Sequence, residues 1–205
     1  PHRLITGLAT GYECVKMKVL FIGDRLFMKF PDAAYFQRRL EEVGAEYVST
    51  EGYTDEQLRT AAADAAALVV IGRPISRATI EACVSCRLVM TLSVGFDVVD
   101  VKAATERGIP VSNCPLYCSE EVAEHAITLA TALSRKVHEL PLHVSGGGWD
   151  YKQARPIRSF RSKTFAVVGL GRIGRHSARK AAALGMRVVA FDPYVDDDIF
   201  DLLGV

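Results

Sequence analysis

Three glycines near the C-terminal end of the chain have a spacing that could hold a phosphate group. Gly169, Gly171 and Gly174 follow an apolar run, Phe165–Val168, that predicts a strand, and they open a helix expected over Ile173–Leu184. In such a turn the first glycine permits a sharp bend, the second lets a pyrophosphate approach the backbone, and the third lets the helix pack closely on the strand. The N–H groups and the dipole of the helix would then bind the phosphate.

A carboxylate stands where the ribose of an adenosine would lie. Asp192 ends the next expected strand, Arg187–Phe191, and comes 18 residues after Gly174. There it could accept hydrogen bonds from both ribose hydroxyls. It would also repel a 2′-phosphate, and Pro193 and Tyr194 supply no cation in its place, so the pattern favours NAD over NADP. A structural glycine turn with a surface aspartate is the alternative. The agreement of strand, helix, second strand and acid argues against it.

The composition is that of an ordinary globular protein of 205 residues, with 49% hydrophobic and 24% charged residues. A net charge of +1 provides no general attraction for nucleic acid or an anionic membrane, so neither is expected as a partner. No apolar run approaches the ~18 residues that a membrane span needs. Residues 1–16 resemble a loose extension without a clear signal peptide, Met17 could be the natural start, and a cytoplasmic location is the default expectation.

The cysteines allow two interpretations. In spacing alone, Cys83 and Cys86 together with Cys114 and Cys118 could be four zinc ligands. Reduced and mostly buried thiols are the alternative. Cys86 precedes an expected strand and Cys114 follows another strand of the same parallel sheet, which places them at opposite ends of that sheet. We therefore expect reduced thiols and no metal site. The fifth cysteine is Cys14.

Strands and helices alternate through the first half of the chain. Strands are predicted at Lys18–Gly23, Ala45–Ser49, Ala66–Ile71, Arg87–Leu92 and Ile109–Ser112. Four helices are predicted. The first is Pro31–Val43, and the second is a short helix that begins with a capping box formed by Thr54 and Gln57. The third is Ser76–Cys83, with Ser76 as its cap, and the fourth is Val99–Arg107. This alternation predicts an α/β fold with a parallel sheet and helices on both of its faces.

The alternation of strands and helices stops after the fifth predicted strand. Ser119–Leu140 has the pattern of one long helix opened by Ser119, with Pro141 and Gly146–Gly148 as its stop. We therefore expect a domain boundary near residue 115, with one domain over residues 17–115 and a second over residues 116–205.

Five short blocks of sequence occur in a characteristic order. They are Ser93–Asp97, Glu106–Pro115, Val122–His125, Gly148–Trp149 and Thr164–Gly174. With them the chain resembles the D-isomer-specific 2-hydroxyacid dehydrogenases, and within that family the branch of the C-terminal-binding-protein corepressors. The likeness covers Lys18 to Val205. It implies two α/β lobes with the active site between them: a flavodoxin-like substrate lobe, and the first βαβ unit of an incomplete Rossmann NAD-binding domain.

The resemblance implies NAD-dependent oxidoreduction at the CH–OH group of a small D-2-hydroxy acid, by a homodimer that pairs through the helix starting at Ser119. The implied cofactor-binding residues are Gly169, Gly171, Arg172, Ile173, Gly174, Asp192, Pro193, Tyr194, Val94 and Val122. Backbone N–H groups of Val94 and Gly95 would meet the substrate carboxylate beyond the end of a strand. A plain turn is the alternative for this loop. Arg73 could attract the carboxylate, with a solvated surface arginine as the alternative.

No catalytic residue is expected in this chain. In the family an Arg, a Glu and a His follow the aspartate that matches Asp192, whereas the tail Tyr194–Val205 contains none of these residue types. The resemblance therefore implies the N-terminal part of a longer enzyme, inactive by itself. An NAD(H)-responsive, corepressor-like binding protein without turnover is the alternative function.

Overall fold

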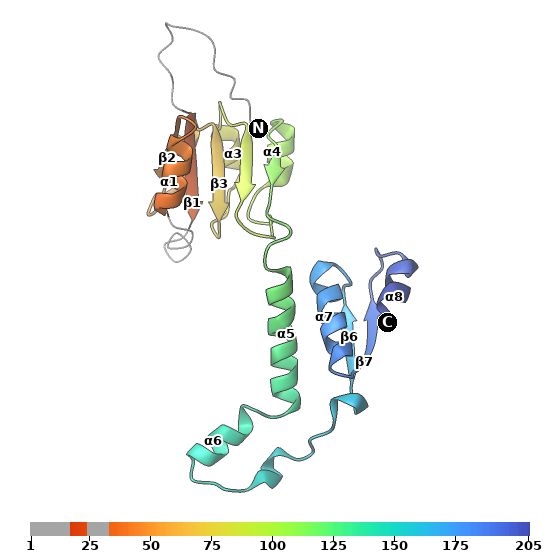
Figure 1. Ribbon diagram of the computed structural model, residues 1–205. Coiled ribbons are helices and arrows are strands. Elements are labelled where there is room, and N and C mark those ends of the chain that lie inside the picture. The colour runs from red at the N-terminus through yellow and green to blue at the C-terminus, as the bar shows by residue number, and fades with distance from the viewer. Residues whose placement is uncertain (1–16, 24–32) are drawn as a thin grey trace, which may run out of the picture. The chain divides into compact units, whose positions relative to one another are not determined.

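The computed structural model describes residues 17–23 and 33–205. The expected extension 1–16 and the first residues of the helix predicted from Pro31 lie outside the described residues. The described chain falls into two compact units, one ending at Tyr117 and the other formed by Cys118–Val205 (Figure 1). Every helix in the described part is too short or too polar to cross a bilayer.

The first unit is built on a parallel sheet of five strands with the order β2-β1-β3-β4-β5 (Figure 1). The strands are β1 (Met17–Gly23), β2 (Ala45–Ser49), β3 (Ala67–Ile71), β4 (Leu88–Thr91) and β5 (Val111–Ser112). All four strand pairs are parallel. This order is that of the flavodoxin-like doubly wound sheets, so the predicted parallel α/β fold is confirmed.

Helices cover both faces of this sheet. They are α1 (Ala33–Glu41), α2 (Asp55–Ala62), α3 (Arg77–Ala82) and α4 (Val101–Glu106). Because side chains alternate along a strand, β1 sends Leu20 and Ile22 into the core beneath α2, α3 and α4. Its residues Val19 and Phe21 enter a second cluster, which Phe36 of α1 covers. Burial on both faces explains why these strands are almost continuously apolar.

The predicted capping box at the start of α2 is confirmed. The Gln57 amide donates to Thr54 Oγ1 at 3.2 Å, and the Thr54 amide donates to Gln57 Oε1 at 2.9 Å. Ser76 occupies the predicted cap position of α3, but its hydroxyl lies 3.3 Å from the Thr79 hydroxyl and bonds no helix amide. A hydroxyl partner nearby competes with the backbone for the serine side chain.

The fourth helix begins two residues later than expected. Asp100 caps α4 by accepting from the Ala103 amide at 2.8 Å, so the helix starts at Val101 rather than at Val99. Val99 instead forms a parallel bridge with Ile75. An aspartate cap is a strong start signal, and it determines where this helix begins.

The second unit contains a βαβ motif. Its elements are α5 (Ser119–Ser134), α6 (Glu139–Ser145), the short 3₁₀ turns η1 (Tyr151–Ala154) and η2 (Phe160–Ser162), β6 (Thr164–Val168), α7 (Arg172–Ala183), β7 (Arg187–Phe191) and α8 (Asp197–Leu203). Strands β6 and β7 pair in parallel, with Val168 opposite Phe191. The predicted strand, helix and second strand around the glycines are therefore present.

The single long helix predicted from Ser119 to Leu140 is wrong. It is divided into α5 and α6 at Lys136, which has a left-handed φ of 54°. The Lys136 amide donates to the Leu133 carbonyl and the Val137 amide to the Ala132 carbonyl. Those two bonds form a Schellman motif, in which the left-handed residue is usually glycine. Because no glycine marks it here, the sequence contained no signal for this stop.

Pro141 also has a different role from the predicted one. It lies in the first turn of α6, which begins at Glu139. Amides of the first turn have no partner within their helix, so the missing N–H of proline costs nothing there. Pro141 therefore belongs to the start of a second helix, and Gly146 caps the end of that helix.

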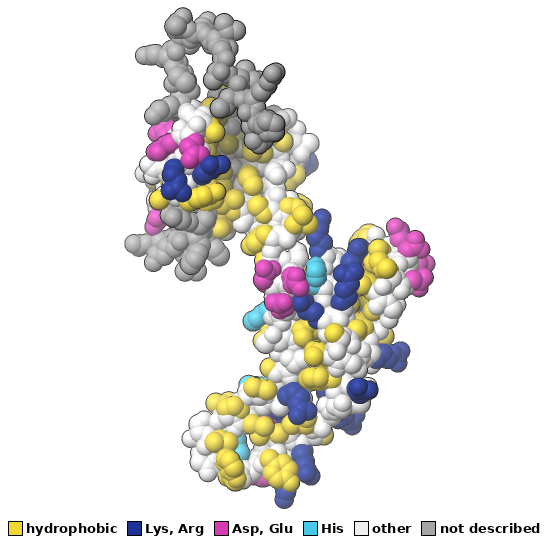
Figure 2. Space-filling view, in the orientation of Figure 1, with side chains coloured by type: hydrophobic (Ala, Val, Ile, Leu, Met, Phe, Trp, Pro, Cys, Tyr) yellow, Lys and Arg dark blue, Asp and Glu magenta, His cyan; other side chains and the backbone are white. Residues whose placement is uncertain are grey.

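Helix α7 is covered by α5 and α8. Ile127 of α5 packs with Ala181 and Met186, while Leu170 and Ala178 belong to a second cluster that the apolar residues of α8 complete. On the surface, Lys180 Nζ lies 3.0 Å from carboxylate oxygens of Glu120 and of Glu124. Figure 2 shows acidic side chains in magenta next to basic side chains in dark blue on the surface of the molecule. The βαβ motif is thus supported from two sides.

Candidate functional site

Each of the three glycines in the βα turn has a different reason to be glycine. Gly169 has a φ of 95°, which disfavours any other residue. A Cβ on Gly174 would lie 2.1 Å from the Gly169 carbonyl oxygen, so helix and strand leave no room for a side chain. A Cβ on Gly171 would meet nothing within 4 Å. The fold itself therefore explains Gly169 and Gly174, but not Gly171.

The start of α7 presents backbone donors beside that open space. Gly171 is the cap residue and has no side chain to accept from the helix amides. The first amide with a partner is that of Arg175, which donates to the Gly171 carbonyl at 3.0 Å. No acceptor among the described residues faces the amides of Arg172, Ile173 and Gly174, and α7 has no acid in its first turn. These are the properties of an anion site at a helix N-terminus.

Asp192 is attached to the glycine turn, which the sequence did not predict. One of its carboxylate oxygens accepts from the Leu170 amide at 2.6 Å, and the other accepts from the Tyr194 amide at 2.9 Å. Arg175 holds the same turn from the helix side, since its Nε donates to the Leu170 carbonyl at 2.8 Å. A carboxylate has about four acceptor positions, so two bonds leave Asp192 able to accept from ribose hydroxyls.

The remaining predicted cofactor contacts are exposed. Tyr194 has 94% of its surface accessible, and Pro193 beside it is exposed as well. Val122 lies in the first turn of α5 and is 43% accessible. The structure brings Pro193 and Tyr194 next to Asp192, at the carboxyl end of β7, and it leaves all three side chains able to contact a ligand.

In the first unit, the predicted substrate loop at Val94 and Gly95 follows β4. Polar side chains bind its carbonyl groups: Asn113 Nδ2 donates to the Val94 oxygen at 2.7 Å, and Ser93 Oγ donates to the Gly95 oxygen at 2.7 Å. The buried Thr91 hydroxyl adds a third contact, 3.2 Å from the Gly95 oxygen. Among the described residues, no acceptor faces the two amides. The loop is thus held so that its N–H groups remain available to an anion.

Sequence reasoning missed the three residues that hold this loop. Thr91, Ser93 and Asn113 belong to quoted sequence blocks or to an expected strand, but nothing in their spacing shows that their side chains meet the same two carbonyl groups. Their contact requires β4 and β5 to lie side by side, which is a property of the sheet order.

Arg73 has a partner already. It follows β3 at the same edge of the sheet, where its Nη2 lies 2.9 Å from Asp55 Oδ1. Only 16% of its side chain is accessible, so Arg73 is neither a freely solvated arginine nor an unoccupied one. A substrate carboxylate would have to compete with Asp55 for the guanidinium.

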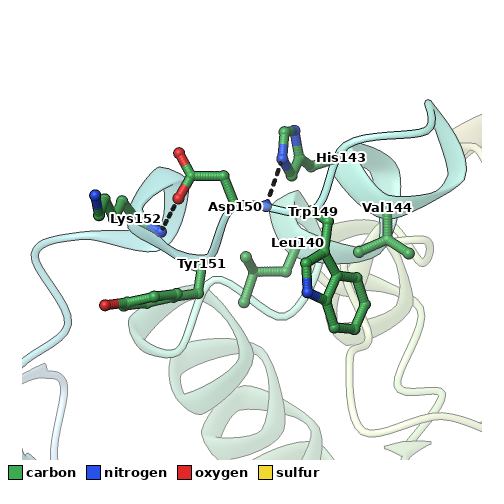
Figure 3. A pocket seen from close by; sticks show the side chains of 7 residues that line it. All are labelled: Leu140, His143, Val144, Trp149, Asp150, Tyr151 and Lys152. Atoms are coloured by element: carbon green, nitrogen blue, oxygen red, sulfur yellow. Dashed lines mark hydrogen bonds between the residues drawn. The ribbon is translucent and has the colours of Figure 1, made fainter.

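An apolar hollow of about 570 Å³ lies in the second unit between α6 and η1. Figure 3 shows the side chains that line it, Leu140, His143, Val144, Trp149, Asp150, Tyr151 and Lys152. His143 Nε2 accepts from the Asp150 amide at 3.2 Å, and Asp150 Oδ1 accepts from the Lys152 amide at 2.9 Å. None of these residues belongs to the glycine turn or to the predicted substrate loop.

The cysteines of the described chain are Cys83, Cys86, Cys114 and Cys118, and all four are free thiols. The described residues contain no group of three or more His, Cys, Asp or Glu side chains placed to hold a metal ion. Cys14 lies outside the described residues.

Residues 26–195 match the model of the family described as "D-isomer specific 2-hydroxyacid dehydrogenase, catalytic domain". The parallel α/β fold, the glycine turn and this match define the class, and the chain belongs to the D-isomer-specific 2-hydroxyacid dehydrogenase family. The predicted family is thus confirmed. The predicted closeness to the C-terminal-binding-protein branch stays a prediction.

Relatives with curated names are oxidoreductases. A D-3-phosphoglycerate dehydrogenase of Methanocaldococcus jannaschii is 38% identical over 167 residues, covering 81% of this chain and 32% of the relative. A glyoxylate reductase of Korarchaeum cryptofilum is 37% identical over 136 residues, covering 64% of this chain and 41% of the relative. The chain thus spans roughly a third of the length of the phosphoglycerate dehydrogenase it matches.

Solved structures share the fold. The D-lactate dehydrogenase of Aquifex aeolicus, complexed with NAD and lactic acid, superposes with a TM-score of 0.75 at 23% identity, over 89% of this chain and 54% of that one. The TT0316 protein of Thermus thermophilus gives a TM-score of 0.72 at 28% identity, over 88% of this chain and 58% of that one. At the lower identity the likeness concerns the fold alone.

Proposed function

We propose that this chain binds NAD at the turn between β6 and α7. The observation that carries the proposal is the open space at Gly171, beside helix amides that have no acceptor in the described chain. A pyrophosphate would occupy that space and accept from the amides of Arg172, Ile173 and Gly174. Asp192 would accept from the adenosine ribose, with Pro193 and Tyr194 beside it and Val122 as a further contact.

We infer that the function is oxidoreduction at the CH–OH group of a small D-2-hydroxy acid. The bound NAD would supply the hydride chemistry. The residues of this chain would bind and orient the acid, because the amides of Val94 and Gly95 are free donors while their carbonyl groups are held by Asn113, Ser93 and Thr91. Arg73 would contribute when it exchanges Asp55 for the substrate carboxylate. The enzyme names of the relatives support this class of substrate.

We assign residues 17–115 to substrate binding and residues 116–205 to cofactor binding. We further propose a homodimer that pairs through α5. Leu129, Leu133 and Val137 support this proposal, since they are 51%, 62% and 55% accessible on and just after that helix. A cytoplasmic location stays a prediction.

The first test measures cofactor affinity in the Gly171→Ala variant. The backbone of Gly171 has a φ of −68°, which alanine adopts readily, and the added Cβ meets no protein atom within 4 Å. We therefore expect unchanged folding by circular dichroism and at least about tenfold weaker NAD binding by calorimetry, equivalent to about 1.4 kcal/mol. An unchanged affinity would contradict the proposed phosphate site.

The matched control is Gly146→Ala at the end of α6. Gly146 is likewise exposed with a φ of −77°, and its Cβ would make only an ordinary contact of 3.4 Å with the Leu142 oxygen. NAD affinity should equal that of the parent chain. If both variants bind less well, the effect of Gly171→Ala is not local to the turn.

The second test concerns turnover. We propose that the 205 residues by themselves bind the cofactor without catalysis, because none of their side chains is assigned to proton transfer. NADH oxidation by this chain with a panel of small 2-keto acids should equal the rate without protein. Turnover above that background would contradict this part of the proposal.

A further inference from the structure

Two cysteines share the turn that joins α3 to β4 in the first unit. Cys83 caps the end of α3 and is 1% accessible, while Cys86 precedes β4 and is partly accessible. Between them, Val84 is 81% accessible, so the turn faces solvent. It lies at the amino ends of the strands, opposite the edge that carries Val94 and Gly95. These thiols therefore take no part in the proposed cofactor or substrate site.

The backbone of this turn is fixed on both sides of the cysteines. The Val84 amide donates to the Ala63 carbonyl at 3.0 Å, and the Arg87 amide donates to the Ala66 carbonyl at 2.9 Å. Arg107 of the neighbouring helix donates to the Cys83 carbonyl. The backbone on both sides of the two cysteines is therefore fixed.

Each thiol donates to a backbone carbonyl, Cys83 to that of Thr79 and Cys86 to that of Leu88, both at 3.3 Å. The two side chains also influence each other, and this makes their acidities unequal. The neighbouring Cys83 side chain lowers the pKa of Cys86 to about 7; burial opposes this shift, and backbone contacts at Leu88 and Leu68 add to it. The Cys86 side chain, together with burial, raises the pKa of the Cys83 thiol far above its usual range. Cys86 is thus the more acidic and the more exposed of the two thiols, and Cys83 is its buried neighbour.

We propose that Cys83 and Cys86 are an oxidation site that closes to a disulfide when the protein meets a hydroperoxide. A low-pKa, accessible cysteine next to a second cysteine is the arrangement found in thiols that respond to oxidants. This proposal is independent of the proposed NAD function, since it requires neither the cofactor nor the second unit.

The chemistry balances with one hydroperoxide per disulfide. The Cys86 thiolate attacks one peroxide oxygen, the O–O bond breaks, and the leaving oxygen takes a proton, which yields a sulfenic acid and, from hydrogen peroxide, one water. The Cys83 sulfur then gives up its proton and attacks the Cys86 sulfur, so that the S–O bond breaks and a second water leaves. Two thiols lose two electrons, and the peroxide gains them.

The other described cysteines lack this arrangement. Cys114 and Cys118 are partly accessible, but no hydrogen bond between their side chains is present in the described chain. They differ from Cys86 in having no thiol partner, and so they serve as internal references for reactivity.

The test treats the 205-residue chain with graded hydrogen peroxide, blocks remaining thiols with iodoacetamide, and analyses a tryptic digest without reduction by mass spectrometry. Arg77 and Arg87 bound the peptide Ala78–Arg87, which holds Cys83 and Cys86 and no other cysteine. Oxidation should convert this peptide from a doubly alkylated form to one that lacks two hydrogen atoms and carries no alkyl group. A dithiol reductant should restore two alkylation sites.

Reactivity supplies the second measurement. At pH 7 we expect Cys86 to be alkylated about tenfold faster than Cys114, because the lowered pKa of Cys86 increases its thiolate fraction. Equal rates would overturn the proposal. It would also fail if Ala78–Arg87 kept two alkyl groups at peroxide concentrations that oxidise Cys114.

Variants separate the roles of the two thiols. Cys83→Ser should leave a sulfenic acid on Cys86 that dimedone traps, and Cys86→Ser should abolish oxidation of the peptide. The control Cys114→Ser should form the disulfide as the parent chain does. If Cys83→Ser folds poorly, the measurements on the parent chain decide by themselves. Dimedone trapping on Cys83 in place of Cys86 would contradict the assigned order of attack.

Discussion

Two turns of this protein, one in each unit, follow strands of parallel sheets and both carry a glycine, yet they are built differently. The turn after β4 is held by side chains, because Thr91, Ser93 and Asn113 bind its carbonyl groups. The turn after β6 is held by close backbone packing and by the carboxylate of Asp192. We conclude that removing one side chain from the first turn should lower the free energy of unfolding only slightly. Adding a single carbon atom to the second turn should lower it strongly.

The largest expected effect tests this contrast directly. Gly174→Ala places a Cβ 2.1 Å from the backbone oxygen of Gly169, whereas Gly95→Ala places one 3.6 Å from the end of the Asp97 side chain. We expect Gly174→Ala to lower the free energy of unfolding by about 3 kcal/mol, the upper end for overpacked sites. Gly95→Ala should change it by less than about 0.5 kcal/mol. Urea unfolding followed by circular dichroism measures both, and equal losses would remove the contrast.

An intermediate effect is expected for the carboxylate that joins the second turn to β7. Asp192→Ala removes the acceptor for the Leu170 and Tyr194 amides as well as the proposed ribose acceptor. Hydrogen bonds to charged groups contribute about 1.5–3 kcal/mol, so NAD affinity should fall about 10-fold to 100-fold. Discrimination against NADP should relax.

The control for Asp192→Ala is Asp198→Ala, an exposed acid in the first turn of α8. Calorimetry with NAD and with NADP should give the values of the parent chain for this control. Unchanged affinities of Asp192→Ala for both nucleotides would exclude Asp192 from the site.

The smallest effect is expected in the first turn. Thr91→Val keeps the shape of a fully buried side chain and removes the hydroxyl that donates to the Ser93 and Gly95 carbonyl oxygens. The Gly95 oxygen still accepts a hydrogen bond from Ser93 Oγ at 2.7 Å. The free energy of unfolding should fall by about 1 kcal/mol. NAD affinity should not change, because the proposed cofactor turn lies in the other unit. A loss of NAD binding measured in the same preparation would contradict the division of roles between the two turns.

Much of the fold could be predicted because its signals are local. The capping residues Thr54 and Gln57 occupy their predicted positions, and β7 has the predicted bounds, Arg187–Phe191. The break between α5 and α6 could not be predicted, since Lys136 adopts a conformation that usually calls for glycine. The two hydrogen bonds of the Schellman motif offset the strain of the left-handed conformation at Lys136. The type of the residue alone does not predict those bonds.

In the candidate site, too, some features follow from local sequence and others only from tertiary contacts. The sequence by itself determined the family, the parallel α/β fold and the glycine turn between β6 and α7, because glycine spacing, apolar runs and short motifs are properties of neighbouring residues. Only the tertiary structure decided that Gly174 is required by the protein and Gly171 is not, that Asp192 binds the turn, and that Arg73 is paired with Asp55. It also placed Cys83 and Cys86 in one turn whose backbone is fixed on both sides. Those facts depend on distances between segments that sheet order and helix packing bring together.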